Sequence, residues 1–152
     1  MSKFNAKKFL TAVVICEGVG ILASFVTFDS VKDWYPTLNK PAFNPPSFIF
    51  GPFWTILYFL MGLSLYLVWQ KGKRTPTIFW LQLFLNGLWS FLFFGLHSPI
   101  LGLIDIIALL MAIILTMKAF YKINKTSGII LLPYLFWVLF ATFLNFSIWR
   151  LN

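Results

Sequence analysis

FGPFWTILYFLMGLSLYLVW, residues 50–69, is the stretch that decides the fold. It contains no Asp, Glu, Lys or Arg, and it has the length of roughly 20 apolar residues that crosses a bilayer as a helix. Inside lipid, every backbone N–H and C=O group must be paired within the protein, and a helix achieves this on its own. The stretch therefore predicts a transmembrane helix.

Four further apolar runs on either side of this stretch have the same character. We predict spans at 9–28, 77–96, 100–121 and 128–149 in addition to 50–69. Their only charged residues are Glu17 in the first run and Asp105 and Lys118 in the fourth. Strands of a membrane barrel would be shorter and would alternate in polarity. We therefore expect an all-α membrane protein in which residues 1–152 form a single five-transmembrane-helix bundle.

The composition also indicates lipid as the surrounding solvent. The chain is 60% hydrophobic and only 11% charged, whereas soluble domains have about 25% charged residues. The net charge is +8, but the bases form short clusters between apolar runs, which is typical of orientation signals and not of a nucleic-acid surface. Cys16 is the single cysteine, and no Cys/His cluster is evident. We expect no metal, no cofactor and no nucleic-acid partner.

The basic residues also predict the direction of the bundle. With five spans, the N-terminus shares one side of the membrane with the second and fourth connections. That side has nine Lys and Arg residues against three on the other. The nine are Lys3, Lys7, Lys8, Lys71, Lys73, Arg74, Lys118, Lys122 and Lys125, and the three are Lys32, Lys40 and Arg150. Since bases accumulate in cytoplasmic loops, we expect a cytoplasmic N-terminus and an outside C-terminus.

The first connection, residues 29–49, differs from the others in length and composition. Residues 34–46 read WYPTLNKPAFNPP, with four prolines in eleven residues. Prolines preclude a regular helix and reduce the conformational freedom of the unfolded loop, so we expect an ordered Pro-rich loop. Its aromatic residues fit either a lid over the mouth of the bundle or a connector among lipid headgroups.

Polar and aromatic residues recur at helical spacing in three of the predicted spans. The stripes are Trp54, Tyr58 and Met61 in the second span, Gln82, Asn86, Trp89, Ser90 and Phe93 in the third, and Trp137, Ala141 and Asn145 in the fifth. Three such stripes would enclose a cavity with apolar walls and a few hydrogen-bonding groups, which is the usual composition of a ligand pocket. The alternative is that the amide side chains form hydrogen bonds between helices and do not contact a ligand.

Isolated polar residues allow two interpretations each. Glu17 is either a proton or ligand contact or a neutral acid bonded to a neighbouring helix. Asp105 would pair with Lys40 or cap a helix, and His97 is expected to be a solvated loop residue. Ala108 and Ala112 have the small-xxx-small spacing of a helix contact or a dimer face.

These motifs together resemble the TspO/translocator-protein family, also called the tryptophan-rich sensory or peripheral benzodiazepine receptor family. The resemblance extends from Trp34 to the C-terminus. Its residues are Trp34-Tyr35, Leu38, Lys40-Pro41, Pro45-Pro46, Phe50-Gly51-Pro52, Trp54, Tyr58, Met61-Gly62, Gln82-Leu83, Asn86, Trp89-Ser90, Phe93-Phe94-Gly95, Pro133-Tyr134, Trp137, Phe140-Ala141, Leu144-Asn145 and Ile148-Trp149.

The resemblance implies a five-helix bundle, a homodimer, and a ligand pocket under the first loop in a bacterial cell membrane. Family ligands include porphyrins and haem-related tetrapyrroles, sterols, and isoquinoline or benzodiazepine drugs. Transferred by motif, the ligand-binding residues are Tyr35, Pro45, Trp54, Tyr58, Asn86, Trp89, Ser90, Phe93, Trp137, Ala141 and Asn145. Some bacterial members degrade protoporphyrin in light with two pocket tryptophans, and Trp54 and Trp137 are the candidate redox residues here.

Three functions follow as expectations. The first is a tetrapyrrole-binding membrane protein with a transport, sensing or regulatory role, in which Lys40 lies near the propionates. The second is a light-dependent porphyrin-degrading enzyme, and the third is a stress-linked membrane scaffold or interaction protein. Sterol binding is not expected, because residues 144–150 have no Tyr for the Leu-Tyr-Arg pattern of the animal sterol motif.

Overall fold

The computed structural model describes residues 4–152, and the regular structure in this part of the chain is entirely helical. Five of its helical segments are long and apolar enough to cross a membrane, which confirms the predicted number of spans. The elements are α1 (Ala6–Asp33), η1 (Tyr35–Thr37), α2 (Ser47–Gln70), α3 (Thr77–Ser90), η2 (Phe91–Gly95), α4 (Pro99–Ile123), α5 (Lys125–Ile129) and α6 (Leu132–Leu151).

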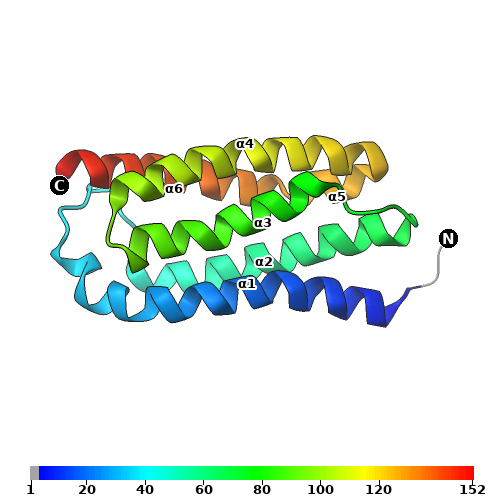
Figure 1. Cartoon of the computed structure of the whole chain (residues 1–152), viewed down its shortest axis with the longest axis horizontal. Helices are drawn as coiled ribbons and strands as arrows, with labels where there is room; N and C mark the ends of the chain where they lie inside the picture. The colour runs from blue at the N-terminus through cyan, green and yellow to red at the C-terminus, as the bar shows by residue number, and fades with distance from the viewer. Residues whose placement is uncertain (1–3) are drawn as a thin grey trace.

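The helices run up and down the long axis of the bundle (Figure 1), and their contacts arrange them in a ring. Helix α1 packs against α2 and α3, α3 packs against α4, and α4 packs against α5 and α6. The ring closes through contacts of α2 with α5 and, more sparsely, with α6. Helix α6 ends at the opposite end of the bundle from the start of α1 (Figure 1). We call the end where α1 begins the basic end, and the end where α6 stops the loop end.

Local sequence signals position the starts of the helices. Asn5 caps α1 by accepting a hydrogen bond from the Lys8 amide at 3.0 Å, and Ser98 caps α4 in the same way, with Pro99 in the first turn. Such caps satisfy N–H groups that have no partner inside the helix. Pro46 and Pro76 directly precede α2 and α3, where the missing proline N–H costs nothing because the first amides of a helix are unpaired.

Two spans are less regular than the sequence predicted. The last five residues of the third span form a π-helical turn, η2. The fifth span is two helices, α5 and α6, separated by a turn at Ile130 and Leu131. Pro133 lies in the first turn of α6, and because proline has no N–H and excludes the carbonyl of the preceding turn, it favours a helix start at this point. Helix α1 is longer than the predicted 9–28 at both ends.

Large apolar side chains cover the outside of the bundle, and most buried polar groups face inward. Phe25 is 73% exposed and Phe48 is 78% exposed, which suits a surface in contact with lipid. The basic end contains eight of the nine bases that predict its direction, and Lys3 lies outside the described residues. Which side of the membrane this end faces stays a prediction.

Candidate ligand cavity

A cavity of about 480 Å³ lies inside the loop end of the bundle. Its walls come from α1, α2, α3 with η2, and α6, and α4 contributes none of the described lining residues. The lining residues are Glu17, Gly20, Ile21, Ala23, Ser24, Thr27, Phe28, Val31, Lys32, Tyr35, Ser47, Phe50, Gly51, Trp54, Thr55, Tyr58, Trp89, Ser90, Phe93, Phe94, Trp137, Ala141, Leu144, Asn145 and Ile148. The volume falls within the range of small-molecule sites, about 300–1,000 Å³.

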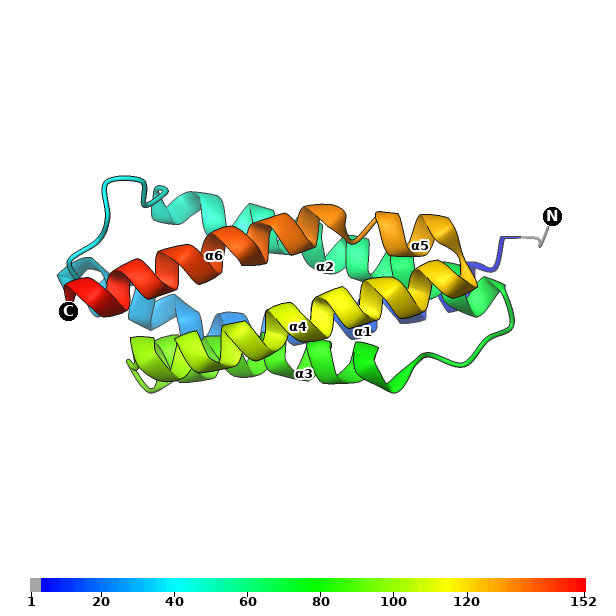
Figure 2. The same cartoon turned by 90° about the horizontal axis from the view of Figure 1, so that it is seen from above.

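Two glycines determine where α1 and α2 touch and where they separate. A Cβ on Gly62 would lie 2.7 Å from the Val13 Cα, and a Cβ on Gly20 would lie 2.6 Å from the ring of Tyr58. Only glycine permits these approaches. Beyond Gly20, α1 and the first half of α2 diverge toward the loop end, and their residues face each other across the cavity (Figure 2). The Tyr58 ring therefore forms the floor.

Aromatic rings line most of the remaining wall. The Trp89 ring stacks on Phe93 with centroids 5.2 Å apart, and the Trp54 ring lies 6.4 Å from Trp89 at an interplanar angle of 31°. On the opposite flank, the Trp137 ring stacks on Phe53 at 4.5 Å. These offset and stacked arrangements hold the rings in fixed orientations. The cavity thus has broad, flat and rigid apolar surfaces.

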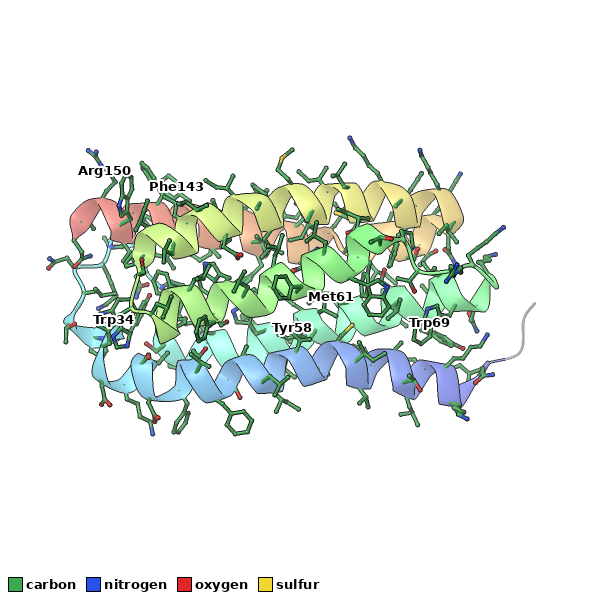
Figure 3. The ribbon with its side chains drawn as sticks, viewed as in Figure 1. Trp34, Tyr58, Met61, Trp69, Phe143 and Arg150 are labelled. Atoms are coloured by element: carbon green, nitrogen blue, oxygen red, sulfur yellow. The ribbon has the colours of Figure 1, made fainter. Side chains whose placement is uncertain are left out.

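The buried amides link the helices to one another. The Tyr58 hydroxyl donates to the Asn86 carbonyl oxygen, and the Asn86 amide donates to the Tyr134 hydroxyl at 2.6 Å. Tyr134 in turn donates to Gln82 at 2.9 Å. Tyr58 and Met61, which contacts Gln82, both lie inside the bundle (Figure 3). This network joins α2, α3 and α6. The amides of Asn86 and Gln82 therefore form hydrogen bonds between helices, which was the alternative to a ligand contact.

Asn145 has a bridging role as well as a place on the cavity wall. Its carbonyl oxygen accepts a hydrogen bond from the Trp89 indole N–H at 3.0 Å, and its amide donates to the Pro99 carbonyl at 2.8 Å. Asn145 therefore fixes the orientation of one wall tryptophan and attaches α6 to α4. The indole N–H of Trp137, in contrast, is buried and has no hydrogen-bond partner in the described part of the chain.

Hydroxyl groups on the wall are largely used by their own helices. Ser24 donates to the Ile21 carbonyl at 2.6 Å, Thr27 donates to Ala23 at 2.9 Å, and Thr55 donates to Gly51 at 3.0 Å. These bonds leave mainly carbon atoms and hydroxyl lone pairs for a ligand. The cavity surface is therefore more apolar than its residue types suggest.

Charged groups occur at the two ends of the cavity. The half-buried Glu17 lies on the wall one turn from Gly20, toward the floor. Lys32 lies on the wall near the loop end, with its ammonium 3.6 Å from the centroid of the Phe28 ring. Lys40, which the sequence suggested for a ligand carboxylate, is not on the wall. Its ammonium donates to the carbonyls of Tyr35 at 2.9 Å and Leu38 at 2.8 Å, so it stabilises the first loop.

The first loop contributes Tyr35 to the cavity wall and contacts two other segments at the loop end. Trp34 stacks on His97 at a centroid distance of 4.6 Å, and His97 is also 3.2 Å from the Ser30 hydroxyl. Asn39 exchanges hydrogen bonds with Asn152 at the end of α6, at 3.0 and 2.9 Å. His97 is an exposed loop residue, as the sequence predicted, and one face of its ring also packs against Trp34.

Between the end of α1 at Asp33 and the start of α2 at Ser47, Tyr35 alone lies on the cavity wall, and it is 4% exposed. Its hydroxyl donates to Asn44 at 2.6 Å, which closes the loop on itself. Burial raises the pKa of Tyr35 to about 12, although the hydrogen bond to Asn44 opposes the shift. The phenol is therefore neutral at physiological pH.

The structure brings nine of the eleven predicted ligand-binding residues to this one cavity. They are Tyr35, Trp54, Tyr58, Trp89, Ser90, Phe93, Trp137, Ala141 and Asn145. Pro45 is not on the wall, and Asn86 lies behind Tyr58. Glu17, for which ligand contact was one of two interpretations, is on the wall formed by α1, but sequence reasoning missed the rest of that wall, where Gly20, Ser24, Thr27 and Val31 follow one helical face. That spacing of small residues was the available signal.

The remaining polar predictions have different outcomes. Asp105 is 5% exposed and one of its carboxylate oxygens has no partner among the described residues, so it does not pair with Lys40. Ala112 is buried within the bundle, whereas Ala108 is exposed, so the two do not form one exposed face. Among residues 4–152, no three His, Cys, Asp or Glu side chains are grouped closely enough to hold a metal ion.

Comparisons with known proteins agree with the motifs. The TspO/MBR family model matches residues 12–150. The chain is 48% identical to a tryptophan-rich protein TspO of Archaeoglobus fulgidus over 97% of this chain and 99% of that protein. It is 36% identical to a tryptophan-rich sensory protein of Cereibacter sphaeroides, over 95% of this chain and 90% of the other. It is also 36% identical to the human translocator protein, over 78% and 75% of the two chains.

Proposed function

The chain belongs to the TspO/MBR family of membrane proteins, and from this premise we propose that its cavity binds a tetrapyrrole, a porphyrin or haem-related compound. The bound compound is transported, sensed or used for regulation at the membrane. The names of the relatives, sensory protein and translocator protein, fit either kind of role.

The observation that supports this proposal best is the flat aromatic lining. Trp54, Trp89 and Phe93 follow one another along one flank, and Trp137 lies on the wall supplied by α6. A planar macrocycle gains most from planar walls because stacking adds to the burial of apolar area. A cavity of about 480 Å³ belongs to the size class of drug-sized and cofactor-sized ligands.

Polar groups at the ends of the cavity fit the polar parts of the same ligand. The carboxyl group of Glu17 would accept a hydrogen bond from a pyrrole N–H group near the floor. Lys32 would approach a propionate at the loop end, as a charge-assisted bond. Lys32 thus replaces Lys40, whose ammonium is bonded to loop carbonyls.

Titration of the purified protein with protoporphyrin, followed by tryptophan fluorescence, tests the proposal. We expect saturable quenching, and roughly tenfold weaker binding in Trp54→Ala and in Trp137→Ala, because each loses one stacking surface. Trp80→Phe is the matched control, since Trp80 lies on α3 away from the cavity and is 39% exposed. Quenching that does not saturate, or binding that is as tight in both cavity variants as in the unaltered protein, contradicts the proposal.

A second candidate, light-dependent degradation of the porphyrin, is favoured by the position of Trp54 and Trp137 on the same cavity. A porphyrin bound there would be excited next to two oxidisable indoles, with dioxygen as the oxidant. Illumination of the complex in air should then give products that are absent with Trp54→Phe and Trp137→Phe, which keep an aromatic ring. Identical products from all three proteins would leave the two tryptophans without a catalytic role.

The remaining predictions concern the protein in its membrane. We propose that the basic end faces the cytoplasm, that the first loop is an ordered cover for the cavity, and that the protein forms homodimers in the cell membrane. The bonds of Asn39 and Lys40 support an ordered loop. Native mass spectrometry of the detergent-solubilised protein measures whether dimers form.

A further inference from the structure

A second cavity, of about 420 Å³, lies on the outer surface at the basic end of the bundle. It is lined by Met117, Lys118, Tyr121, Lys122, Gly128, Ile129 and Leu132, and shares none of these residues with the ligand cavity. We propose that this groove binds one anionic phospholipid from the membrane leaflet at the basic end, with the phosphate at the lysines and an acyl chain along the apolar residues.

The groove exists because α4 and α5 approach closely and the chain then changes direction. A Cβ on Gly128 would lie 2.7 Å from the Tyr121 Cβ and 2.9 Å from the Met117 carbonyl oxygen. On its other side, α5 is fixed to α2 by the Ser64 hydroxyl, which donates to the Ser127 carbonyl at 2.6 Å. The turn at Ile130 and Leu131 then separates α5 from α6. Gly128 therefore forms a floor without a side chain.

Polarity along the groove matches a phospholipid near the membrane surface. Tyr121 and Lys122 lie next to the end of α4 at Ile123, whereas Met117 is one turn deeper. On the other wall, Ile129 is followed by the deeper Leu132, the first residue of α6. The surface of the groove is almost entirely carbon, so both lysines line it through their aliphatic stems, and Lys118 lies at the depth of Met117. Such stems extend toward the membrane surface, where the two ammonium groups would meet a lipid phosphate above an acyl chain in the groove.

The charge of the groove indicates which headgroup it prefers. Lys118 and Lys122 lie one turn apart on α4 and are both exposed, and like charges at this spacing repel each other. Neither lysine forms a salt bridge with an acid of residues 4–152, because the four acids, Glu17, Asp29, Asp33 and Asp105, are at mid-span or near the loop end. A phosphate group between the two ammonium groups would relieve this repulsion. A zwitterionic headgroup would bring its own cation and gain less.

The same charges argue against a second copy of the chain as the occupant. A symmetric contact through this groove would bring two pairs of lysines together without added acids. A lipid supplies both the negative charge and the apolar chain that the groove lacks. Basic pockets between membrane helices commonly hold anionic headgroups in this way.

Native mass spectrometry of the full chain, solubilised and supplied with phosphatidylglycerol or phosphatidylcholine of the same acyl chains, tests the proposal. We expect one retained phosphatidylglycerol, favoured roughly tenfold over phosphatidylcholine. The double variant Lys118→Gln with Lys122→Gln should abolish this preference, since each lysine contributes roughly a fivefold change in affinity. The matched control is Lys71→Gln with Lys73→Gln, which removes the same charge at the same end but outside the groove. It should change retention less than twofold.

A groove-filling variant provides an independent measurement. Ile129 is 51% exposed, so Ile129→Trp is expected to fold and to occupy the acyl-chain part of the groove. It should lower the retention of both lipids. The proposal is overturned by equal retention of the two lipids in the unaltered protein, by equal losses in the groove and control double variants, or by displacement of the lipid with millimolar inorganic phosphate. Dissociation of a dimer in the groove variant without loss of lipid would assign the groove to a second copy.

Discussion

At the scale of single residues, Gly20 and Gly18 provide the sharpest contrast in the chain. They are two positions apart on α1, but an added Cβ would meet the Tyr58 ring at 2.6 Å from Gly20 and nothing within 4 Å from Gly18. The ring cannot retreat freely, because its hydroxyl is bonded to Asn86. The space next to Gly20 therefore determines the position of the cavity floor.

We predict opposite effects of alanine at these two positions. Gly20→Ala should destabilise the bundle by about 1–3 kcal/mol, the usual cost of overpacking, and should weaken porphyrin binding by displacing Tyr58. Gly18→Ala should be neutral or stabilising by about 0.5–1 kcal/mol, because alanine favours the helix. Thermal unfolding in detergent measures both. Equal stabilities for the two variants would mean that Gly20 is not a close contact.

The raised pKa of Tyr35 allows a test, at alkaline pH, of whether the first loop covers this side chain. Burial raises its pKa to about 12 in the folded protein, against about 10 for an unfolded tyrosine. The neutral phenol is thus favoured by folding, and its contribution to stability is complete below pH 10 and is lost as the pH rises to 12. In a pH titration, the difference in ultraviolet absorbance between the unaltered protein and Tyr35→Phe reports the phenolate of Tyr35. This phenolate should appear with a midpoint near pH 12. A midpoint near 10 would mean that the loop does not cover Tyr35 in solution.

At the scale of elements, the first loop depends on its attachment to the end of α6. The backbone N–H of Asn39 donates to the Asn152 side chain, and that side chain donates back to the Asn39 carbonyl. Asn152→Ala removes both bonds while changing no residue of the cavity wall. We expect the amide of Asn39 to exchange with solvent deuterium roughly fivefold faster or more, because its bond is worth about 1 kcal/mol or more.

Ser147→Ala is the matched control for this experiment. Ser147 is a half-buried residue of the same helix whose hydroxyl donates to the Phe143 carbonyl at 2.9 Å. Its replacement should leave exchange in the loop unchanged. If exchange at Asn39 is also unchanged in Asn152→Ala, the loop is held by other contacts, such as the stack of Trp34 on His97.

The sequence predicted some elements of the site better than others, for a physical reason. The stripes on α2, α3 and α6 consist largely of residues with indole, phenol and amide groups, and polar groups are unfavourable at positions that face lipid. Most residues of these stripes do line the cavity. The wall from α1 includes Gly20, Ser24, Thr27 and Val31, residue types that occur equally on lipid-facing and packed surfaces. Composition therefore did not distinguish them.

Hydrogen bonds between residues far apart in the chain also could not be predicted from the sequence. Asn86 and Asn145 appeared as candidates for both ligand contact and helix contact, and the choice depends on which side chains face them across the bundle. The break in the fifth span was signalled by Pro133, but membrane helices often tolerate proline without a break. The structure adds that α5, the short helix before the turn, packs against α2 and α4.

At the scale of the whole molecule, the distribution of bases predicts one orientation. The cytoplasmic side should be the basic end, because cytoplasmic loops accumulate Lys and Arg. Cysteine variants at Lys73 and Lys40, in loops at opposite ends, should be labelled by a membrane-impermeant maleimide from opposite sides. In intact cells we expect labelling of Lys40→Cys only, measured in a background where the buried Cys16 is replaced by alanine. Labelling of Lys73→Cys alone would reverse the orientation.

The absence of α4 from the cavity wall has a consequence for how proteins of this architecture diverge. Residues of α4 such as Ile106, Leu109 and Ile113 are almost completely buried and hold the bundle together, yet none of them contributes to the described wall. Substitutions that alter ligand preference can therefore accumulate on the other spans while α4 preserves the architecture. Selection for a new ligand and selection for a stable bundle would then act on largely separate sets of codons, which allows one scaffold to acquire different ligands in different lineages.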